Sequence, residues 1–394
     1  MDVTQVGVLL LVACVVAIIA RRLKLPYTVG LVLAGSGMAI LGAWPNMVIS
    51  KELIFDTLLP PLVFEAAFAI RWPRFKRDLA LIATIASLGV VVATAIVAYG
   101  MTVFAGWDWR AALIFAALIA ATDPVSVIAT MKESKVGGRL KLLVEAESLM
   151  NDGTGAAMFA IALGTLAVGK INPGGAAFSF IFISFGGLIA GTAVGLLCVW
   201  LMGRVSDHLV EIALSTVAAY GSFLLGEHFA VSGVLATVAA GMIIGNYGPL
   251  RGLSAKGHAE VERFWEFAAF VANSFVFLLM GIKLANENYS NIWLVAALAT
   301  VLVLFSRLVS VFGCCALFSR SKLRVPMKHQ ALLFWGGLRG ALALSLALAI
   351  PDTMPNYHEV IEVTFVVVAF SVIAQGLTVK PLIMRIQKMP QPEA

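Results

Sequence analysis

The stretch Glu147-Ser-Leu-Met-Asn-Asp-Gly-Thr-Gly155 places acidic side chains inside an apolar run that extends from about residue 142 to residue 168. At ~1.5 Å of rise per residue, a helix of this length crosses a hydrocarbon core of about 30 Å and carries Asp152 near its middle. A carboxylate at that depth costs about 2.5–3.5 kcal/mol on insertion scales, so a membrane protein keeps one mainly for a function. The stretch therefore predicts a membrane helix with a functional acid at its centre.

Helical spacing arranges the polar side chains of this stretch in two stripes. Ser148 and Asp152 are four residues apart and share one stripe, while Glu147 and Asn151 form the next. Carboxylate, hydroxyl and amide oxygens are hard ligands that suit a small hard cation, and a carboxylate also accepts a proton. We therefore expect a cation or proton site on this helix.

The composition of the 394-residue chain is that of a polytopic helical membrane protein. Hydrophobic residues make up 60% of the chain and charged residues 13%, with a mean hydropathy of +0.95, whereas soluble domains carry about 25% charged residues. The net charge of +6 is thus no argument for nucleic-acid binding, because loop charges orient membrane helices.

The four cysteines lie in apolar runs without metal-ligand spacing. The first apolar run lacks the basic start and the cleavage site of a signal peptide.

Apolar runs along the chain predict about thirteen membrane spans. Alternate loops hold 21 of the 28 Lys and Arg residues, so the positive-inside rule places the N-terminus outside and the C-terminus in the cytoplasm. The tail from Met389 to Ala394 is too short to fold, and no soluble domain is expected there. The expected spans are 2–20, 27–43, 47–70, 79–104, 110–131, 142–168, 174–202, 207–226, 229–248, 258–283, 291–318, 327–350 and 358–383.

Two of these spans, the fifth and the twelfth, contain helix-breaking sequence at matching places. The fifth carries Thr122-Asp-Pro124, and the twelfth carries Trp335-Gly-Gly-Leu-Arg-Gly340, three glycines around a buried arginine. Proline lacks an N–H and disfavours helix at the residue before it. If spans one to six form one repeat and the seventh is a linker, the two breaks correspond and the second repeat is inverted. Paired interruptions in inverted repeats predict a transport site at the membrane midplane.

Each of these features taken alone also has a structural explanation. A lone Thr-Asp-Pro commonly starts a helix and Gly-Gly can serve close packing, but two intramembrane aspartates together favour function. Glu147 and Arg339 are predicted to form a structural ion pair between spans six and twelve, with Arg307 of span eleven as the rival partner. Glu65, near the cytoplasmic end of span three, fits an interfacial carboxylate as well as a role in ion access.

Five motifs, in order along the chain, resemble those of the cation/proton antiporters of the NhaP and sodium/hydrogen-exchanger branch. The resemblance covers essentially the whole chain and implies the NhaA-like antiporter fold, an all-α membrane fold with two inverted six-helix repeats and two crossing unwound helices. It also implies a homodimer in the plasma membrane that exchanges Na⁺ or Li⁺, in some relatives K⁺, for H⁺ without a cofactor. The motifs are Pro60-Pro-Leu-Val-Phe-Glu65, Ala121-Thr-Asp-Pro124, Glu147-Ser-Leu-Met-Asn-Asp152, Trp335-Gly-Gly-Leu-Arg-Gly340 and Ser371…Gln375-Gly-Leu-Thr378.

The same resemblance implies roles for particular residues. Asp152 is expected to carry Na⁺ and H⁺ in turn, and Glu65 to line or gate the site. Four further residues are expected to complete or support the site: Asp123, Thr122, Ser148 and Asn151. The expected oxygen ligands of Na⁺ come from Asp152, Asp123, Ser148 and Thr122.

The resemblance further implies a division of each protomer into a dimerisation domain and a mobile core. Residues 1–78 and 207–290 are assigned to dimerisation, and residues 79–168 and 291–386 to the ion-transporting core. Residues 169–206 form a linker helix, and 387–394 a short cytoplasmic tail.

The physics of one buried carboxylate is sufficient to explain antiport. If Asp152 holds either a proton or a cation but never stays bare, the core crosses only when neutral, because moving a bare carboxylate through a low-dielectric barrier is costly. Asn151 cannot titrate, so we expect electroneutral exchange of one cation for one proton. Three alternatives remain: a K⁺/H⁺ antiporter with the same site, a cation channel, and an intramembrane aspartyl protease with Asp123 and Asp152 as its dyad. The paired broken helices favour alternating access over a channel. A protease needs two carboxylates close enough to share a proton, and nothing in the sequence resembles the motifs that surround such a dyad, so the chain is not expected to be an enzyme.

Overall fold

The computed structural model describes residues 3–23, 25–42, 52–169, 172–286, 289 and 292–388. The regular secondary structure of these residues is helical, and the one extended pairing among them is a single antiparallel bridge. The all-helical prediction is therefore confirmed. The predicted start of the third span at residue 47 and the predicted tail 389–394 lie outside the described residues, as do the loop residues Lys24, Lys51 and Lys170.

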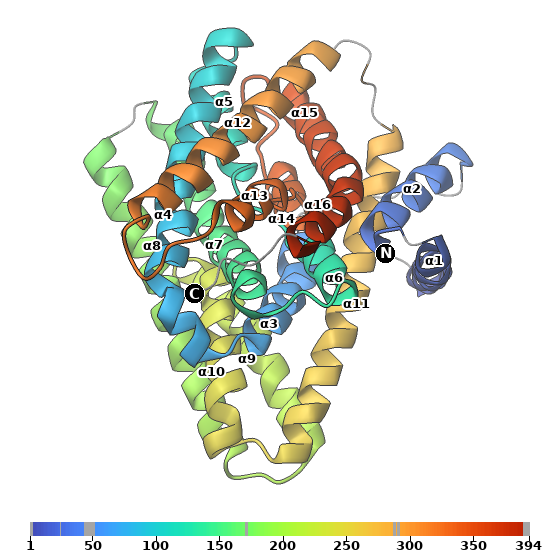
Figure 1. Ribbon diagram of the computed structural model, residues 1–394, viewed down its shortest axis with the longest axis vertical. Coiled ribbons are helices and arrows are strands. Elements are labelled where there is room, and N and C mark those ends of the chain that lie inside the picture. The colour runs from blue at the N-terminus through green and yellow to red at the C-terminus, as the bar shows by residue number, and fades with distance from the viewer. Residues whose placement is uncertain are drawn as a thin grey trace.

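Sixteen α-helices and two short π-helices, named η1 and η2, follow one another along the described chain (Figure 1). In order they are α1 (Val3–Leu23), α2 (Tyr27–Ile40), η1 (Leu53–Leu58), α3 (Leu59–Ala69), α4 (Trp72–Phe104), α5 (Trp109–Leu118), α6 (Val125–Glu133), α7 (Gly138–Val168), α8 (Pro173–Met202), α9 (His208–His228), α10 (Gly233–Arg251), α11 (Ala255–Asn286), α12 (Trp293–Leu317), α13 (Met327–Trp335), α14 (Ala341–Leu348), α15 (Tyr357–Phe370), η2 (Ser371–Gln375) and α16 (Gly376–Lys388).

Seven helical segments of the described chain are long and apolar enough to cross a membrane unaided, namely α1, α4, α8, α9, α11, α12 and the continuous run α15–η2–α16. Helix α7 has 31 residues but is not one of them, because it carries the charged stretch that begins at Glu147. The other predicted spans correspond to short or interrupted helices, such as α5 with α6 and α13 with α14. The total of about thirteen spans stays a prediction.

Side-chain caps mark where several helices begin. The Asp108 carboxylate accepts a hydrogen bond from the backbone N–H of Arg110, 2.9 Å away, at the start of α5. The Ser232 hydroxyl accepts one from the N–H of Leu235 at the start of α10. Such caps satisfy N–H groups that have no partner within the helix.

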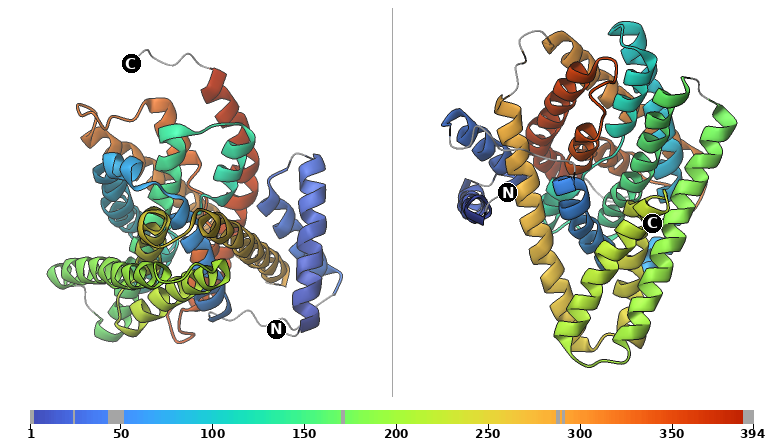
Figure 2. Two further views of the ribbon diagram at one scale, coloured as in Figure 1. Left: turned by 90° about the horizontal axis from the view of Figure 1, so that it is seen from below. Right: turned by 180° about the vertical axis from the view of Figure 1, so that it is seen from behind.

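The helices pack in two groups. In one group α2 lies along α11, α3 packs on α10, and α10 also contacts α8 and α9; in the other, α4 packs against α5, α7 and α12. Glycine permits the closest of these contacts, since a Cβ on Gly35 of α2 would collide with the carbonyl oxygen of Leu278 in α11. Figure 2 shows α1 and α2 at one edge of the molecule and the neighbouring pair α8 and α9 toward the other. Helix α7, which carries the charged stretch, also contacts α3, α8 and α10 of the first group.

Candidate ion-binding site

The two interruptions occur where the sequence predicts them, and they meet. Helix α5 ends at Leu118 and α6 begins at Val125, while α13 ends at Trp335 and α14 begins at Ala341. The backbone N–H of Asp123 donates to the carbonyl oxygen of Leu338 over 2.7 Å, which forms the single antiparallel bridge. The unwound backbone from one half of the chain is thereby joined to the unwound backbone from the other.

Two charged side chains complement the helix ends at this crossing. The Asp123 carboxylate accepts a hydrogen bond of 2.9 Å from the N–H of Val125, at the N-terminus of α6. The Arg339 guanidinium donates to the carbonyl oxygens of Ala120 and Ala121, at 2.7 and 2.9 Å, just beyond the C-terminus of α5. An anion at a helix N-terminus and a cation at a C-terminus both offset the helix dipole. Each of these two charges therefore stabilises the helix end that it contacts.

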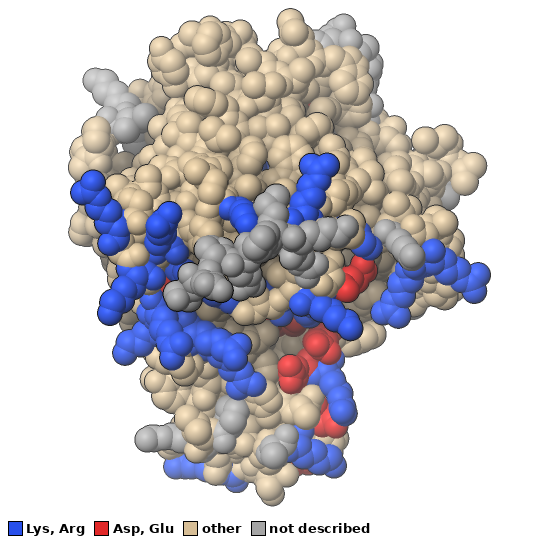
Figure 3. Space-filling model, in the orientation of Figure 1, with Lys and Arg blue, Asp and Glu red and all other residues tan. Residues whose placement is uncertain are grey.

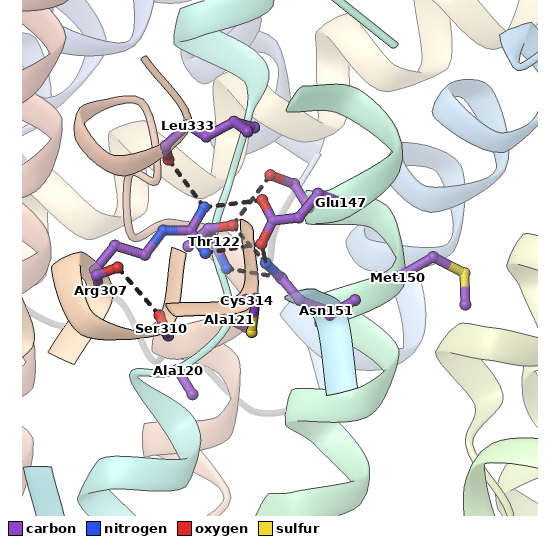
Figure 4. A network of polar contacts seen from close by, with 12 residues as sticks. Ala120, Ala121, Thr122, Glu147, Met150, Asn151, Arg307, Ser310, Cys314 and Leu333 are labelled. Atoms are coloured by element: carbon purple, nitrogen blue, oxygen red, sulfur yellow. Dashed lines mark hydrogen bonds and ion pairs between the residues drawn. The ribbon is translucent and has the colours of Figure 1, made fainter. Parts of the chain in front are cut away.

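The predicted ion pair between Glu147 and Arg339 is wrong. Glu147 binds Arg307 of α12 instead, through two hydrogen bonds of 2.7 and 2.9 Å in a parallel, bidentate arrangement (Figure 4). Arg339 lies on unwound backbone beside carbonyl groups that lack helical partners, so those carbonyls satisfy its guanidinium. The rival partner considered from the sequence is the one found. All three charged side chains are buried.

The Asn151 side chain stabilises the crossing of the two unwound segments through hydrogen bonds and does not line a cavity. Its Oδ1 accepts from the N–H of Thr122 over 3.0 Å, and its Nδ2 donates to the Thr122 hydroxyl at 2.7 Å and to Glu147 at 2.9 Å (Figure 4). The hydroxyls of Thr122 and Ser148 also lie 3.0 Å apart, within hydrogen-bond distance. These contacts fasten the unwound segment of the fifth span to α7. Ser148 and Asn151 are therefore buried supports, and neither lines the cavity described next.

A cavity of about 240 Å³ lies beside the crossing, between α3, α6, α7, α11 and α14. Four of the predicted site residues line it: Asp152, Asp123, Thr122 and Glu65. Further along the cavity stand Glu145 of α7 and Lys132 of α6, next to the basic loop that joins these helices. The lining thus holds four carboxyl groups and a single ammonium group. Such a surface attracts small cations.

Besides Lys132, two polar residues of this cavity were not predicted as site residues. Glu145 precedes Asp152 by seven residues, or two helical turns, so the spacing that grouped Ser148 with Asp152 also places Glu145 on that side of α7. Asn273 lines the cavity from α11, and its one signal in the sequence is a polar residue within an apolar span. Neither residue belongs to the motifs on which the prediction rested.

The π-helix η2 holds the second unwound segment in place. Its Ser371 hydroxyl accepts a hydrogen bond of 2.9 Å from the N–H of Arg339 and donates to the side-chain oxygen of Gln375. The Gln375 amide donates to the carbonyl oxygen of Trp335 over 3.1 Å, and the Trp335 indole donates to the Thr378 hydroxyl. The motif from Ser371 to Thr378, which had no assigned role, is therefore a bracket for the break between α13 and α14.

Two glycines of the second break are required by their neighbours. A Cβ on Gly340 would collide with the Asp123 carboxylate, and a Cβ on Gly337 would lie 2.5 Å from Nε of Arg307. At either position a Cβ atom would be too close to the charged group, so any other residue type would displace that group. The glycines thus allow the backbone to approach the charged groups of Asp123 and Arg307.

The fold and this site define a class of protein. Broken helices that cross at a buried charged centre, beside an acidic cavity in a polytopic helical protein, are the construction of a secondary transporter for small cations. The chain belongs to the sodium/hydrogen exchanger family, whose transmembrane family model matches residues 9–385. Members of this family are transporters and not enzymes, which confirms the family and the class predicted from the motifs.

Similar proteins cover nearly the whole chain. The Na⁺/H⁺ antiporter ApNhaP of Aphanothece halophytica is 35% identical over 363 residues, which are 91% of this chain and 69% of that protein. The Na⁺/H⁺ antiporter NhaP of Pseudomonas aeruginosa is 32% identical over 357 residues, 85% of this chain and 81% of that protein. The solved structure of the sodium proton antiporter MjNhaP1 from Methanocaldococcus jannaschii has a TM-score of 0.79 at 19% identity and covers 98% of this chain and 99% of that one. The last comparison supports the fold.

Proposed function

We propose that this chain exchanges Na⁺ or Li⁺ for H⁺ across the cell membrane, with one cation and one proton competing for Asp152. The observation that carries the proposal is the acidic cavity, into which Asp152 and Asp123 both open beside the crossing of the two broken helices. The names of the relatives, Na⁺/H⁺ antiporters, support Na⁺ as the cation.

The surroundings of Asp152 support its role as the carrier. Its carboxylate has no hydrogen bond or ion pair within the described chain, and the charged groups that act on it are two other acids, Asp123 and Glu147. A carboxylate in such a place is costly to leave bare in a low-dielectric interior. A proton or a cation from the cavity would remove that cost, and the two cannot occupy the same oxygens together. Competition between them couples their movements.

The neighbours of Asp152 support a stoichiometry of one to one. Glu147 is already compensated by Arg307, and Asp123 by the N-terminus of α6. Asn151 is an amide that cannot titrate, and its Nδ2 donates to Glu147. A single carboxylate then changes its ligand in each half-cycle. Exchange is electroneutral and independent of the membrane potential.

The two packing groups support an elevator movement. In the proposal, residues 79–168 and 291–386 form the mobile core, which contains both broken helices and Asp152. Residues 1–78 and 207–290 form the dimerisation domain of a homodimer, 169–206 the linker helix, and 387–394 a cytoplasmic tail. Loop charge supports a cytoplasmic C-terminus: Lys and Arg gather on the face shown in Figure 3, over the ends of α6, α13 and α16 that Figure 1 places there.

Reconstituted protein tests the proposal directly. The chain is placed in liposomes with a trapped pH dye, and Na⁺, Li⁺ or K⁺ is added outside while the membrane potential is clamped. Alkalinisation on addition of Na⁺ or Li⁺, equal at every potential, is the expected result. A response to K⁺ alone keeps the site but changes the cargo to that of a K⁺/H⁺ antiporter. Rates that depend strongly on potential contradict the one-to-one stoichiometry, and no response to any cation contradicts antiport.

A further inference from the structure

Asn273 is a partly buried residue whose side-chain oxygen has an unusual environment. The residue lines the acidic cavity from α11, and its side-chain oxygen Oδ1 is inaccessible to solvent yet has no hydrogen-bond partner among the described residues. Most buried polar atoms in proteins are hydrogen-bonded, and leaving one unsatisfied is destabilising. An acceptor that lacks a partner beside a cation pathway indicates a ligand that is present only for part of the working cycle.

The chemistry of that acceptor suits a cation. An amide oxygen is a hard ligand of the kind that binds Na⁺ and other hard cations, and it replaces a water of hydration without adding charge. The four carboxyl groups around the cavity attract the ion, but another carboxylate at position 273 would add a charge to be compensated. A neutral oxygen can coordinate the ion and release it again.

Asn273 lies on the opposite side of the cavity from the core residues. Helix α11 packs along α2 and against α3, whereas Asp152 is on α7 and Asp123 is on the unwound segment before α6. The cavity runs from Asp152 toward Lys132 and Glu145, beside the basic loop. An ion that enters from that loop's side therefore passes between α11 and the core.

We propose that Oδ1 of Asn273 is a ligand for the transported cation, directly or through one water, when the cavity is open on the side of the basic loop. The proposal rests on the proposed antiport function and extends it. When the core moves away from α11, this ligand is left behind, so it contributes to cation binding at one membrane face and not at the other. Asn273 thus makes the apparent affinities of the two faces unequal.

Two substitutions that keep the volume of the Asn273 side chain test this ligand, and a third at the next residue is the control. Asn273→Leu removes the oxygen, whereas Asn273→Asp keeps an oxygen at the same place. Ser274→Ala is the matched control on α11, because Ser274 lies within hydrogen-bond distance of the Tyr27 hydroxyl and does not line the cavity. Na⁺-dependent proton exchange is measured in everted and in right-side-out membrane vesicles, so that each face is titrated with Na⁺ separately.

Asn273→Leu is expected to raise the half-saturating Na⁺ concentration about tenfold at the face next to the basic loop, as loss of one bond to a charged group predicts. The other face changes less than about twofold. Asn273→Asp keeps an oxygen and adds a negative charge, so its half-saturating Na⁺ concentration at the loop face should be no higher than that of wild type, and Ser274→Ala should match wild type. If Asn273→Leu does not accumulate in the membrane, Asn273→Ala carries the same expectation, since it removes the oxygen without adding bulk.

Three results would overturn the role of Asn273. They are an unchanged Na⁺ titration for Asn273→Leu, an equal rise at both faces, and an equal effect of Asn273→Asp, which would assign the effect to packing or to the amide N–H groups. A wild-type chain that exchanges no protons for Na⁺ at either face contradicts the antiport function itself. The two failures are therefore distinguishable.

Discussion

Glu147 and Asp152 lie five residues apart on α7, and their surroundings are opposite. Glu147 is 2% exposed, and it receives two hydrogen bonds from Arg307 and one from Asn151. Asp152 borders the cavity, and within the described chain no positive group is paired with it. One acid is compensated permanently by the protein, and the other must be compensated by what enters from water. In the proposed mechanism, the same residue chemistry thus serves architecture at Glu147 and transport at Asp152.

Removal of the uncompensated acid should have the largest effect on transport. Asp152→Asn keeps the shape of the side chain but can neither release a proton nor bind a cation as an anion, so exchange should fall by at least about 100-fold. Dye-loaded proteoliposomes measure it. Glu133→Gln, which changes an exposed acid outside the cavity, serves as control and should exchange normally. Appreciable exchange by Asp152→Asn would refute Asp152 as carrier.

Removal of one partner of the Glu147–Arg307 ion pair should instead lower the stability of the fold. Glu147→Gln leaves the Arg307 charge buried without its carboxylate, and the free energy of unfolding should drop by about 3–5 kcal/mol. Denaturation in detergent, followed by intrinsic fluorescence, measures the change. The double substitution Glu147→Gln with Arg307→Met should recover most of the loss, because no unpaired charge remains. A single variant as stable as wild type would show that the pair is not structural.

Loss of a hydrogen bond between η2 and the break between α13 and α14 should have a moderate effect on turnover and on stability. Gln375→Leu removes the amide that donates to the Trp335 carbonyl, which frees the backbone next to Arg339. We expect turnover to fall about tenfold, with a loss of roughly 1–2 kcal/mol in the free energy of unfolding. The control Ser222→Ala removes a buried side-chain hydrogen bond within α9, which contains neither break. Equal turnover in the two variants would argue against a positioning role for η2.

The smallest effect is expected at the Asp108 cap, far from either acid of α7. Asp108→Ala should lower the free energy of unfolding by about 1 kcal/mol through loss of the cap, and leave exchange unchanged. The hydrogen bond from the Arg110 side chain holds the pKa of the Asp108 carboxyl below its usual value. A lowered pKa stabilises the fold at neutral pH, and this contribution is lost as the pH falls through it.

Urea denaturation at pH 7 and at about pH 3 measures that contribution. The difference in unfolding free energy between wild type and Asp108→Asn should shrink at the lower pH, because the amide caps the helix without titrating. A difference independent of pH would contradict the assignment of the lowered pKa to Asp108.

Local chemistry made the two helix breaks predictable, as well as the presence of a buried acid beside them. Pro124 cannot continue a helix, Gly336 and Gly337 weaken one, and a mid-span acid such as Asp152 has few uses apart from function. The partner of Glu147 was not predictable in this way, because Arg307 and Arg339 are both buried arginines of apolar spans. The choice of Arg307 over Arg339 follows from the packing of α12 against the unwound segment between α13 and α14, which only the structure shows.

Other parts of the site left weaker signals in the sequence. Ser148 shares a helical stripe with Asp152, yet its hydroxyl meets Thr122, because the unwound segment lies closer to α7 than the spacing alone can reveal. The π-helix η2 has no residue pattern that separates it from an α-helix, so its role as a bracket depends on the three-dimensional structure. Asn273 belongs to no motif and becomes notable only when its neighbours are known.

The contact between Gly340 and the Asp123 carboxylate has a consequence for how this protein can evolve. Every codon change that gives position 340 a side chain places an atom where that carboxylate now lies. A lineage that needs a different cation affinity therefore cannot adjust position 340 by small steps, because the first step already displaces the acid. Inherited variation in selectivity should arise instead on the far wall of the cavity, on α3 and α11, where side chains can change size while the crossing stays intact.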